Sequence, residues 1–330
     1  MKPSTTPPAP RPHGGNLDAA IQAYGGDRAR WIDLSTGINR RPYPLPPLPP
    51  DCWARLPEAS ATARFVQAAR GYTGAGAAVE IVPAPGAQAL IQACPFLRPP
   101  GRVGIVTPTY NEHEAAFAAA GWDVVPLSDL EDLRGLDALV VVNPNNPDGR
   151  CYDPADLLAR AGSLDLLVVD ESFADTAPAL SAIPHLSSDL NPRTVVMRSF
   201  GKFFGLAGLR LGFAACTAPL AHALAERLGP WAVSGPALEV GARAYADAAW
   251  IAETRSRLAV EAARLDALAA EAGWRLIGGT TLFRTYDVGD GVGAQAQLAR
   301  QQIWSRTFPY APGWLRLGIP SGDDRWPSLR

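Results

Sequence analysis

One internal lysine stands among many arginines in this chain. Of the 30 lysine and arginine residues, only Lys2 and Lys202 are lysines. Lys202 lies in the segment Ser199-Phe-Gly-Lys-Phe-Phe-Gly-Leu-Ala-Gly-Leu-Arg210, between a β-branched run and a glycine-rich stretch. Arginine stays protonated, whereas a buried lysine can lose its proton and attack a carbonyl carbon. The position therefore indicates a covalently bound aldehyde cofactor; the alternative is an arginine-rich composition in which one lysine has no chemical role.

Three further polar or aromatic residues follow apolar runs. Asp170 comes directly after the run 166–169, and a carboxylate at the edge of a dry interior is costly unless a cation lies beside it. A protonated ring nitrogen would be such a cation, and a helix cap or turn aspartate is an equally good interpretation. Asn143 follows the run 138–142, and Tyr110 could either stack on a flat ring or cap the core.

A second group of residues could hold a phosphate. Ala87 and Gln88 follow Gly86 at a transition from strand to helix, where backbone N–H groups bind anions without a charged side chain. Ser199 and Arg210, on either side of the lysine, could add a hydroxyl and a guanidinium to the same phosphate.

The elements that must position these residues alternate from about residue 60 to residue 215. Strands are expected at 79–82, 102–106, 122–125, 138–142, 166–169, 194–197 and 211–215, with helices at 61–72, 86–94, 111–120 and 154–161. This alternation predicts an α/β fold with a mostly parallel sheet covered on both faces. Ligands of such sheets bind at the carboxyl ends of the strands, which would bring Asn143, Asp170 and the Lys202 segment together.

The pattern changes near residues 230–240. A long helical stretch at 235–272 precedes strands at 274–277, 282–285 and 314–319 and a helix near 295–303, which is typical of a smaller α+β domain. We therefore predict a disordered Pro-rich tail at 1–12, an N-terminal arm with a substrate loop at 13–50, a large cofactor-binding domain at 51–235 and a small C-terminal domain at 236–330.

Composition excludes several function classes. The chain is 47% hydrophobic and 19% charged, as globular proteins are, and its net charge of −2 gives no bias toward nucleic acid or membrane surfaces. No signal peptide or membrane-spanning run is present. The four cysteines are far apart, so we expect reduced, buried thiols in a cytoplasmic protein and no metal site.

The order of these features resembles one known superfamily over nearly the whole chain. The sites are, in order, Gly86-Ala-Gln, Tyr110, Asn143-Pro-Asn-Asn-Pro, Asp170-Glu-Ser-Phe, Ser199-x-x-Lys202, Arg210 and Arg316. They resemble the fold-type I pyridoxal-phosphate enzymes, aminotransferase class I/II. The Asn-Pro-x-Asn-Pro and Ser-x-x-Lys…Gly-Leu-Arg-x-Gly elements are the most specific parts of the match.

The resemblance implies a role for each residue. Lys202 would bind pyridoxal phosphate as a Schiff base, and Asp170 would pair with the pyridine nitrogen so that the ring acts as an electron sink. Asn143 would bond the ring 3-oxygen, and Tyr110 would stack on the ring. The cofactor phosphate would be held by Ala87, Gln88, Ser199 and Arg210. Arg316 would clamp the α-carboxylate of the substrate.

Within the superfamily, the chain resembles the histidinol-phosphate aminotransferases and especially the threonine-phosphate decarboxylases of the cobalamin pathway. His13-Gly-Gly-Asn and the loop Asp33-Leu-Ser-Thr-Gly-Ile-Asn39 resemble the latter, and Phe173 replaces a tyrosine usual in the former. This likeness makes His13 and Asn39 candidate substrate residues. Arg306, ten residues before Arg316, is the candidate for the substrate phosphate.

Three functions follow from the resemblance. The first is decarboxylation of L-threonine O-3-phosphate to (R)-1-aminopropan-2-ol phosphate, and the second is histidinol-phosphate or related aminotransfer. The third is a non-catalytic, cofactor-bearing partner, suggested because Leu56 stands where relatives carry a tyrosine that reaches the cofactor phosphate of the partner subunit. The resemblance also implies a homodimer.

Overall fold

The computed structural model describes residues 13–187, 189, 191–322 and 324–329, so the expected disordered tail at 1–12 lies outside the described residues. The helices are α1 Leu17–Tyr24, α2 Asp51–Ala54, α3 Ala59–Thr73, α4 Ala87–Ala93, α5 Glu112–Ala119, α6 Pro154–Arg160, α7 Ala218–Leu228, α8 Gly235–Ala246, α9 Ala248–Glu271 and α10 Gly291–Arg300. The strands are β1 Ile32–Asp33, β2 Glu80–Ala84, β3 Arg102–Val106, β4 Asp123–Leu127, β5 Ala138–Val142, β6 Leu166–Asp170, β7 Thr194–Ser199, β8 Gly212–Cys216, β9 Arg275–Thr280, β10 Phe283–Asp287, β11 Ile303–Trp304, β12 Arg306–Phe308 and β13 Ala311–Gly318.

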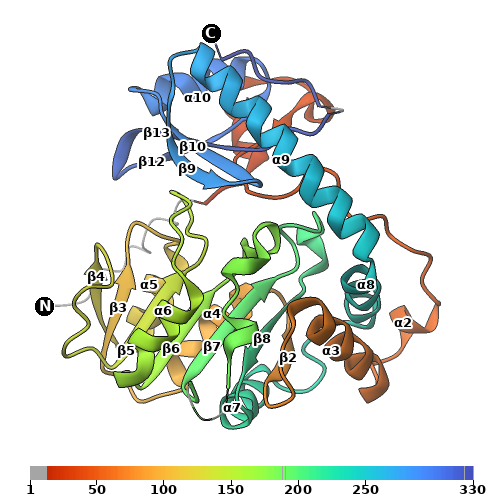
Figure 1. The fold of residues 1–330 in the computed structure, drawn as a ribbon. Helices are drawn as coiled ribbons and strands as arrows, with labels where there is room; N and C mark the ends of the chain where they lie inside the picture. Colours follow the sequence, from red (N-terminus) through yellow and green to blue (C-terminus); the bar gives the residue numbers. More distant parts are fainter. Residues whose placement is uncertain (1–12, 188, 190, 323, 330) are drawn as a thin grey trace, which may run out of the picture.

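The larger sheet has seven strands in the order β2-β8-β7-β6-β5-β3-β4 (Figure 1). Pairing is parallel from β7 through β6, β5 and β3 to β4, while β8 runs antiparallel to both of its neighbours. The predicted α/β fold with a mostly parallel sheet is confirmed. Parallel neighbours end at the same edge, so the residues after β3, β5, β6 and β7 share one side of the molecule.

Alternation along the strands explains why the apolar runs are continuous. In β5, Leu139 and Val141 join one core cluster while Ala138 and Val140 join another, because successive side chains point to opposite faces. The first cluster includes residues of α3, α6 and α8, and the second includes residues of α4, α5 and α7. Both faces are therefore dry, as parallel strands require.

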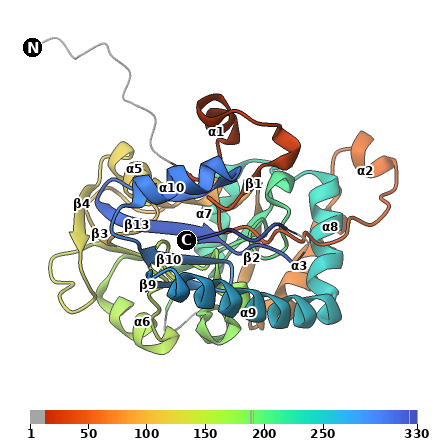
Figure 2. The same ribbon diagram turned by 90° about the horizontal axis from the view of Figure 1, so that it is seen from above.

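The second sheet is antiparallel, in the order β12-β13-β10-β9, and α9 rises to it from beside α8 (Figure 1). β1 pairs in parallel with β11, so the N-terminal segment lies with the C-terminal part of the chain, and α1 is next to α10 (Figure 2). Helix α8 packs against α3, which covers one face of the large sheet. The domain boundaries predicted from the sequence stay a prediction.

Several local features differ from those expected. The helical stretch 235–272 is divided at Asp247, whose side chain accepts a hydrogen bond from Trp250 N at 3.0 Å and so caps α9. The helix expected near 295–303 is α10, which ends before Gln302 because that residue has a φ of 60°. Helix α7 was not predicted. All four cysteines were expected to be buried. Cys94 and Cys216 are buried, but Cys151 is exposed. None of the helices in the described ranges has the length and apolar character needed to cross a bilayer.

Candidate active site

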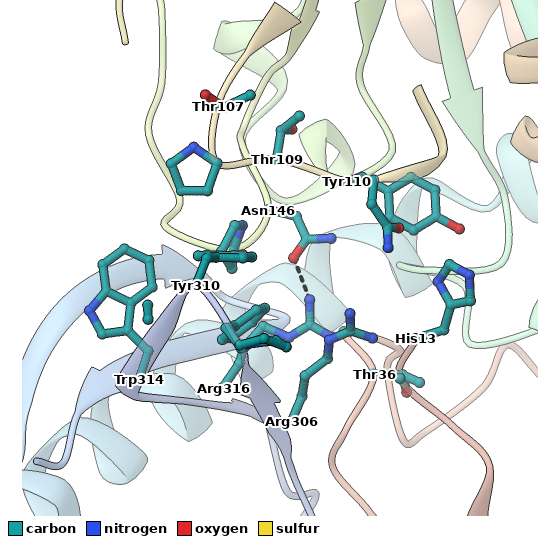
Figure 3. Close-up of a pocket in the computed structure, with 18 of the residues that line it drawn as sticks. His13, Thr36, Thr107, Thr109, Tyr110, Asn146, Arg306, Tyr310, Trp314 and Arg316 are labelled. Atoms are coloured by element: carbon teal, nitrogen blue, oxygen red, sulfur yellow. Dashed lines mark hydrogen bonds between the residues drawn. The ribbon is translucent and has the colours of Figure 1, made fainter. Parts of the chain in front are cut away.

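Two adjoining cavities lie where the carboxyl ends of the large sheet face β12 and β13. The outer cavity has a volume of about 690 Å³ and the inner one about 160 Å³. Tyr110, Asn146, Phe173 and Lys202 line both, so the two form one continuous site. Figure 3 shows the outer cavity with Arg306 and Arg316 on one side and Tyr110 on the other.

Lys202 lies in the turn that follows β7 and is half-buried at the junction of the two cavities. Burial is the largest cause that lowers the pKa of its amine, and the nearby guanidiniums of Arg316 and Arg210 lower it further, while Asp170 opposes them; the resulting pKa is about 8. The ammonium is 5.6 Å from the centroid of the Phe173 ring. An amine with this pKa is partly neutral in mildly alkaline solution and can then act as a nucleophile.

Asp170 ends β6 and is buried on the wall of the inner cavity. Burial opposes its ionisation, but hydrogen bonds from His113 and Ser172 outweigh burial and hold the pKa of the carboxyl below its ordinary value. His113 Nε2 lies 2.9 Å from Asp170 Oδ2, and Ser172 N donates to Oδ1 at 2.9 Å. The site therefore presents a buried, ionised carboxylate in the same cavity as the Lys202 amine.

His113 was missed by the sequence analysis. It lies on α5, is fully buried, and its ring is edge-on to Tyr110 with centroids 6.3 Å apart. Only its spacing of three residues from Tyr110 connects it to the site in the sequence, and a buried histidine on a helix is a common core residue. Its contact with Asp170 depends on the packing of α5 against the large sheet, where α5 contacts β3 and β4.

The inner cavity is lined by all four residues that were predicted to bind the cofactor phosphate: Ala87, Gln88, Ser199 and Arg210. Gly86, which precedes α4, has a φ of +80°, and a Cβ there would lie 2.7 Å from Arg210 Nη2. Glycine is therefore needed both for the backbone angle and for the approach of the guanidinium. Backbone amides, a hydroxyl and a guanidinium together form a cradle suited to a phosphate.

Asn143 lines neither cavity, so the structure does not support its predicted bond to the ring 3-oxygen. Its Nδ2 donates to the carbonyls of Tyr152 at 3.1 Å and Leu180 at 3.2 Å, and its Oδ1 accepts from Tyr152 N at 3.0 Å. These bonds fasten the turn after β5 and occupy both ends of the amide. Asn146, from the same Asn-Pro-Asn-Asn-Pro segment, lines both cavities instead.

Arg306 and Arg316 face each other across β12 and β13, where their Cα atoms are paired in the antiparallel register. Their guanidiniums lie side by side in the outer cavity (Figure 3). Arg316 donates to Asn146 Oδ1 and, at 2.6 Å, to Ser35 O. Burial and then Arg306 lower the pKa of Arg316 to about 9. Among the described residues Arg316 has no carboxylate partner, so this pair of cations suits an anionic ligand.

The two N-terminal candidates lie in different places. His13 lines the outer cavity, with Nε2 3.1 Å from Oε1 of the buried Glu112. Asn39 lines neither cavity: its Nδ2 donates to Phe203 O at 2.9 Å and its Oδ1 accepts from Arg257 Nη2 at 2.9 Å. A direct contact of Asn39 with substrate is therefore not supported. Its amide instead holds the backbone beside Lys202.

Comparisons with known proteins agree with this geometry. The family aminotransferase class I and II matches residues 56–325. A threonine-phosphate decarboxylase of Sinorhizobium sp is 44% identical over 96% of this chain and 96% of its own length, and one of Pseudomonas aeruginosa is 43% identical over 96% and 95%. A solved histidinol-phosphate aminotransferase of Sinorhizobium meliloti, in complex with pyridoxal-5'-phosphate, has a TM-score of 0.76 at 22% identity, covering 95% of this chain and 91% of that one. An L-threonine-O-3-phosphate decarboxylase of Porphyromonas gingivalis has a TM-score of 0.69 at 19% identity, covering 88% and 94%.

Proposed function

This chain belongs to the aminotransferase class I and II family, and we propose that it is a pyridoxal-phosphate-dependent lyase that decarboxylates L-threonine O-3-phosphate to (R)-1-aminopropan-2-ol phosphate for cobalamin biosynthesis. Its likeness to the two bacterial threonine-phosphate decarboxylases extends over nearly the full length of each protein. The observation that carries the proposal is the position of Lys202, which joins a phosphate cradle to a cavity holding two guanidiniums.

The walls of the inner cavity fit pyridoxal phosphate. Lys202 offers an amine that can become neutral, Asp170 offers a buried carboxylate, and the Ala87–Gln88 amides with Ser199 and Arg210 offer a phosphate site. Bound there, the cofactor supplies an electron sink for the breaking of a bond at Cα. Asn146 lines this cavity and would bond the ring 3-oxygen in place of Asn143.

The outer cavity fits a substrate with two anionic groups. The Arg316 fork matches the two oxygens of a carboxylate, and Arg306 beside it can hold a phosphate. His13, from the N-terminal arm, lines the same cavity and can add a donor to that phosphate. A substrate held at both ends cannot rotate freely about Cα, so these contacts orient the bond that breaks.

Lys202 can hold or deliver the proton at Nζ, because its lowered pKa allows both protonation states near neutrality. The same residues would serve transamination, which is the alternative function. A non-catalytic, cofactor-bearing protein would also need the inner cavity, but it would not need Arg306 and Arg316 to hold a substrate in the outer one.

The deciding experiment supplies purified protein and pyridoxal phosphate with threonine phosphate, with and without 2-oxoglutarate. We expect carbon dioxide and aminopropanol phosphate without an acceptor. Product that requires the keto acid would assign an aminotransferase, and no product under either condition would favour the non-catalytic role. Borohydride reduction should attach the cofactor to Lys202, so Lys202→Ala should abolish the attachment and Lys2→Arg should preserve it.

We also propose that the protein is a cytoplasmic homodimer. Large apolar side chains are exposed on and near α2, at Leu45, Trp53 and Leu56, with exposed fractions of 65%, 71% and 62%. A second copy would cover such side chains. Leu56 cannot donate a hydrogen bond, so the tyrosine contact expected from relatives has no counterpart at that position.

A further inference from the structure

The segment 34–43, here called the strap, runs along the turn that carries Lys202. Asn39 N donates to Lys202 O at 3.0 Å, Asn39 Nδ2 to Phe203 O at 2.9 Å, and Tyr43 N to Phe204 O at 2.8 Å. Three consecutive carbonyls of the turn therefore accept hydrogen bonds from the strap. The Phe203 and Phe204 rings are also buried against Trp250. The turn is therefore held by the strap and by Trp250, and Lys202 lines both cavities.

The same strap contacts the substrate end of the site. Ser35 O accepts a hydrogen bond from Arg316 Nη2 at 2.6 Å. At Gly37 a Cβ would lie 2.8 Å from the Phe173 ring, which in turn lies beside the Lys202 ammonium. Ser35 and Gly37 thus contact residues of the site, and Thr36 between them lines the outer cavity. Arg40, the neighbour of Asn39, instead forms an ion pair with Asp324.

Asn39 is locked by its other contacts. It is only 3% exposed, and its Oδ1 accepts from Arg257 Nη2 at 2.9 Å and from Arg41 N at 3.1 Å. Arg257 is paired with Glu261 at 2.6 Å within α9. A buried amide with both ends bonded has one orientation, because any rotation leaves polar groups unsatisfied.

We infer that Asn39 is a positioning residue, which holds the backbone of Lys202 in place through its hydrogen bonds. Because the strap also bonds Arg316, it sets the position of the Lys202 amine relative to the Arg316 guanidinium. The inference rests on the proposed function only in taking Lys202 as the nucleophile. One short segment then fixes both the group that reacts and the group that anchors the substrate. A displacement of either by about 1 Å could cost up to about a hundredfold in rate.

The first test uses the full-length, cofactor-free protein and an amine-reactive sulfonate label. Because the chain has only two lysines, peptide mass spectrometry can follow Lys202 separately, with Lys2 as an internal reference. Asn39→Ala should loosen the turn, so that water reaches the Lys202 amine. The pH midpoint for labelling Lys202 should therefore rise by about one unit, while that of Lys2 should not change.

The second test measures steady-state decarboxylation by the cofactor-loaded protein. Asn39→Ala should lower kcat by about tenfold or more while KM for threonine phosphate changes less than about threefold, since the anion-binding arginines remain. Arg40→Ala is the matched control, because it removes a strap contact that does not involve the lysine turn. It should retain both the labelling midpoint and kcat.

Two results would overturn the inference: an unchanged labelling midpoint in Asn39→Ala, or equal effects of Asn39→Ala and Arg40→Ala on kcat. If Asn39→Ala does not fold, Arg257→Ala removes the guanidinium that holds Asn39 and should move the midpoint in the same direction; no movement there would also overturn it. A wrong substrate assignment can be told apart from a wrong inference about Asn39. Without the right substrate there would be no decarboxylation to measure, but the labelling midpoint of Lys202 could still be compared between variants.

Discussion

At the scale of single residues, the reactivity of Lys202 is set by its surroundings. Burial removes water from the ammonium, and the guanidiniums of Arg316 and Arg210 repel it, so the neutral amine is favoured. Asp170, in the same inner cavity, stays ionised although it is buried, because His113 and Ser172 bond to its carboxylate. One cavity thus holds an amine that favours its neutral form and a carboxylate that favours its charged form, as an electrophilic cofactor bound between them would require.

The pH dependence of Lys202 follows from its lowered pKa. The amine is protonated and unreactive below its pKa and neutral above it, so the rate at which cofactor-free protein combines with pyridoxal phosphate should rise with pH through about 8. Stopped-flow absorbance would measure this rate. A rise centred near the value of ordinary lysine, with a pKa of 10.5, would contradict the prediction. Lys2→Arg should behave as the wild type.

Removal of the Asp170 charge should impair the reaction more than substrate binding. Asp170→Asn keeps the shape of the side chain but cannot stabilise a cation, so kcat should fall by about a hundredfold or more. KM should change little, because Asp170 lines only the inner cavity. Steady-state kinetics with saturating cofactor would test this, and near-normal turnover would make Asp170 a structural residue only.

At the scale of elements, the antiparallel register of β12 and β13 brings two cations together. Arg306→Ala should weaken the binding of phosphorylated substrates and inhibitors and spare unphosphorylated ones, because only the phosphate loses its charged partner. The expected loss is about tenfold to a hundredfold in KM. Arg275→Ala, on β9 and paired with Asp287, is a control from the same sheet. Equal effects on threonine and threonine phosphate would exclude the phosphate role.

The turn after β5 packs directly on the small sheet. A Cβ at Gly149 would lie 2.2 Å from Gly279 N, and the φ of Gly149 is +71°. Gly149→Ala should therefore lower the free energy of unfolding by about 2 kcal/mol or more, from the combined strain of overpacking and backbone angle. Gly162→Ala, where a Cβ would meet nothing within 4 Å, is the matched control. Denaturant unfolding would compare them, and equal midpoints would show that the contact can relax.

At the scale of the whole molecule, the site lies between two sheets and is completed by the N-terminal strap that crosses between them. The exposed apolar residues near α2 lie outside this site. A charge placed there should thus affect association first and chemistry only indirectly.

If the protein is a homodimer through the α2 region, Trp53→Glu should shift it toward monomer, because a buried charge without a partner opposes association. Light scattering across a concentration series would measure the change. Val292→Glu, at another exposed apolar residue on α10, is the control and should leave the mass unaltered. A wild-type protein that is active as a monomer would refute the dimer.

The sequence by itself determined the large sheet and most of the inner cavity. Apolar runs of strand length mark where strands end, and in a parallel sheet those ends share one edge, so Asp170 and the Lys202 turn could be placed from local patterns. The phosphate cradle was predictable for the same reason: it is built from a strand-to-helix turn and from residues that flank the lysine.

The tertiary structure alone decided which side chains face the cavity and which support it. Asn143 and Asn146 belong to one turn, and only its packing against Tyr152 and Leu180 shows that Asn143 faces away. Asn39 bonds to a carbonyl 164 residues away, and His113 contacts Asp170 across 57 residues. Sheet register and loop packing set such contacts. These depend on the whole chain at once, so no local pattern in the sequence contains them.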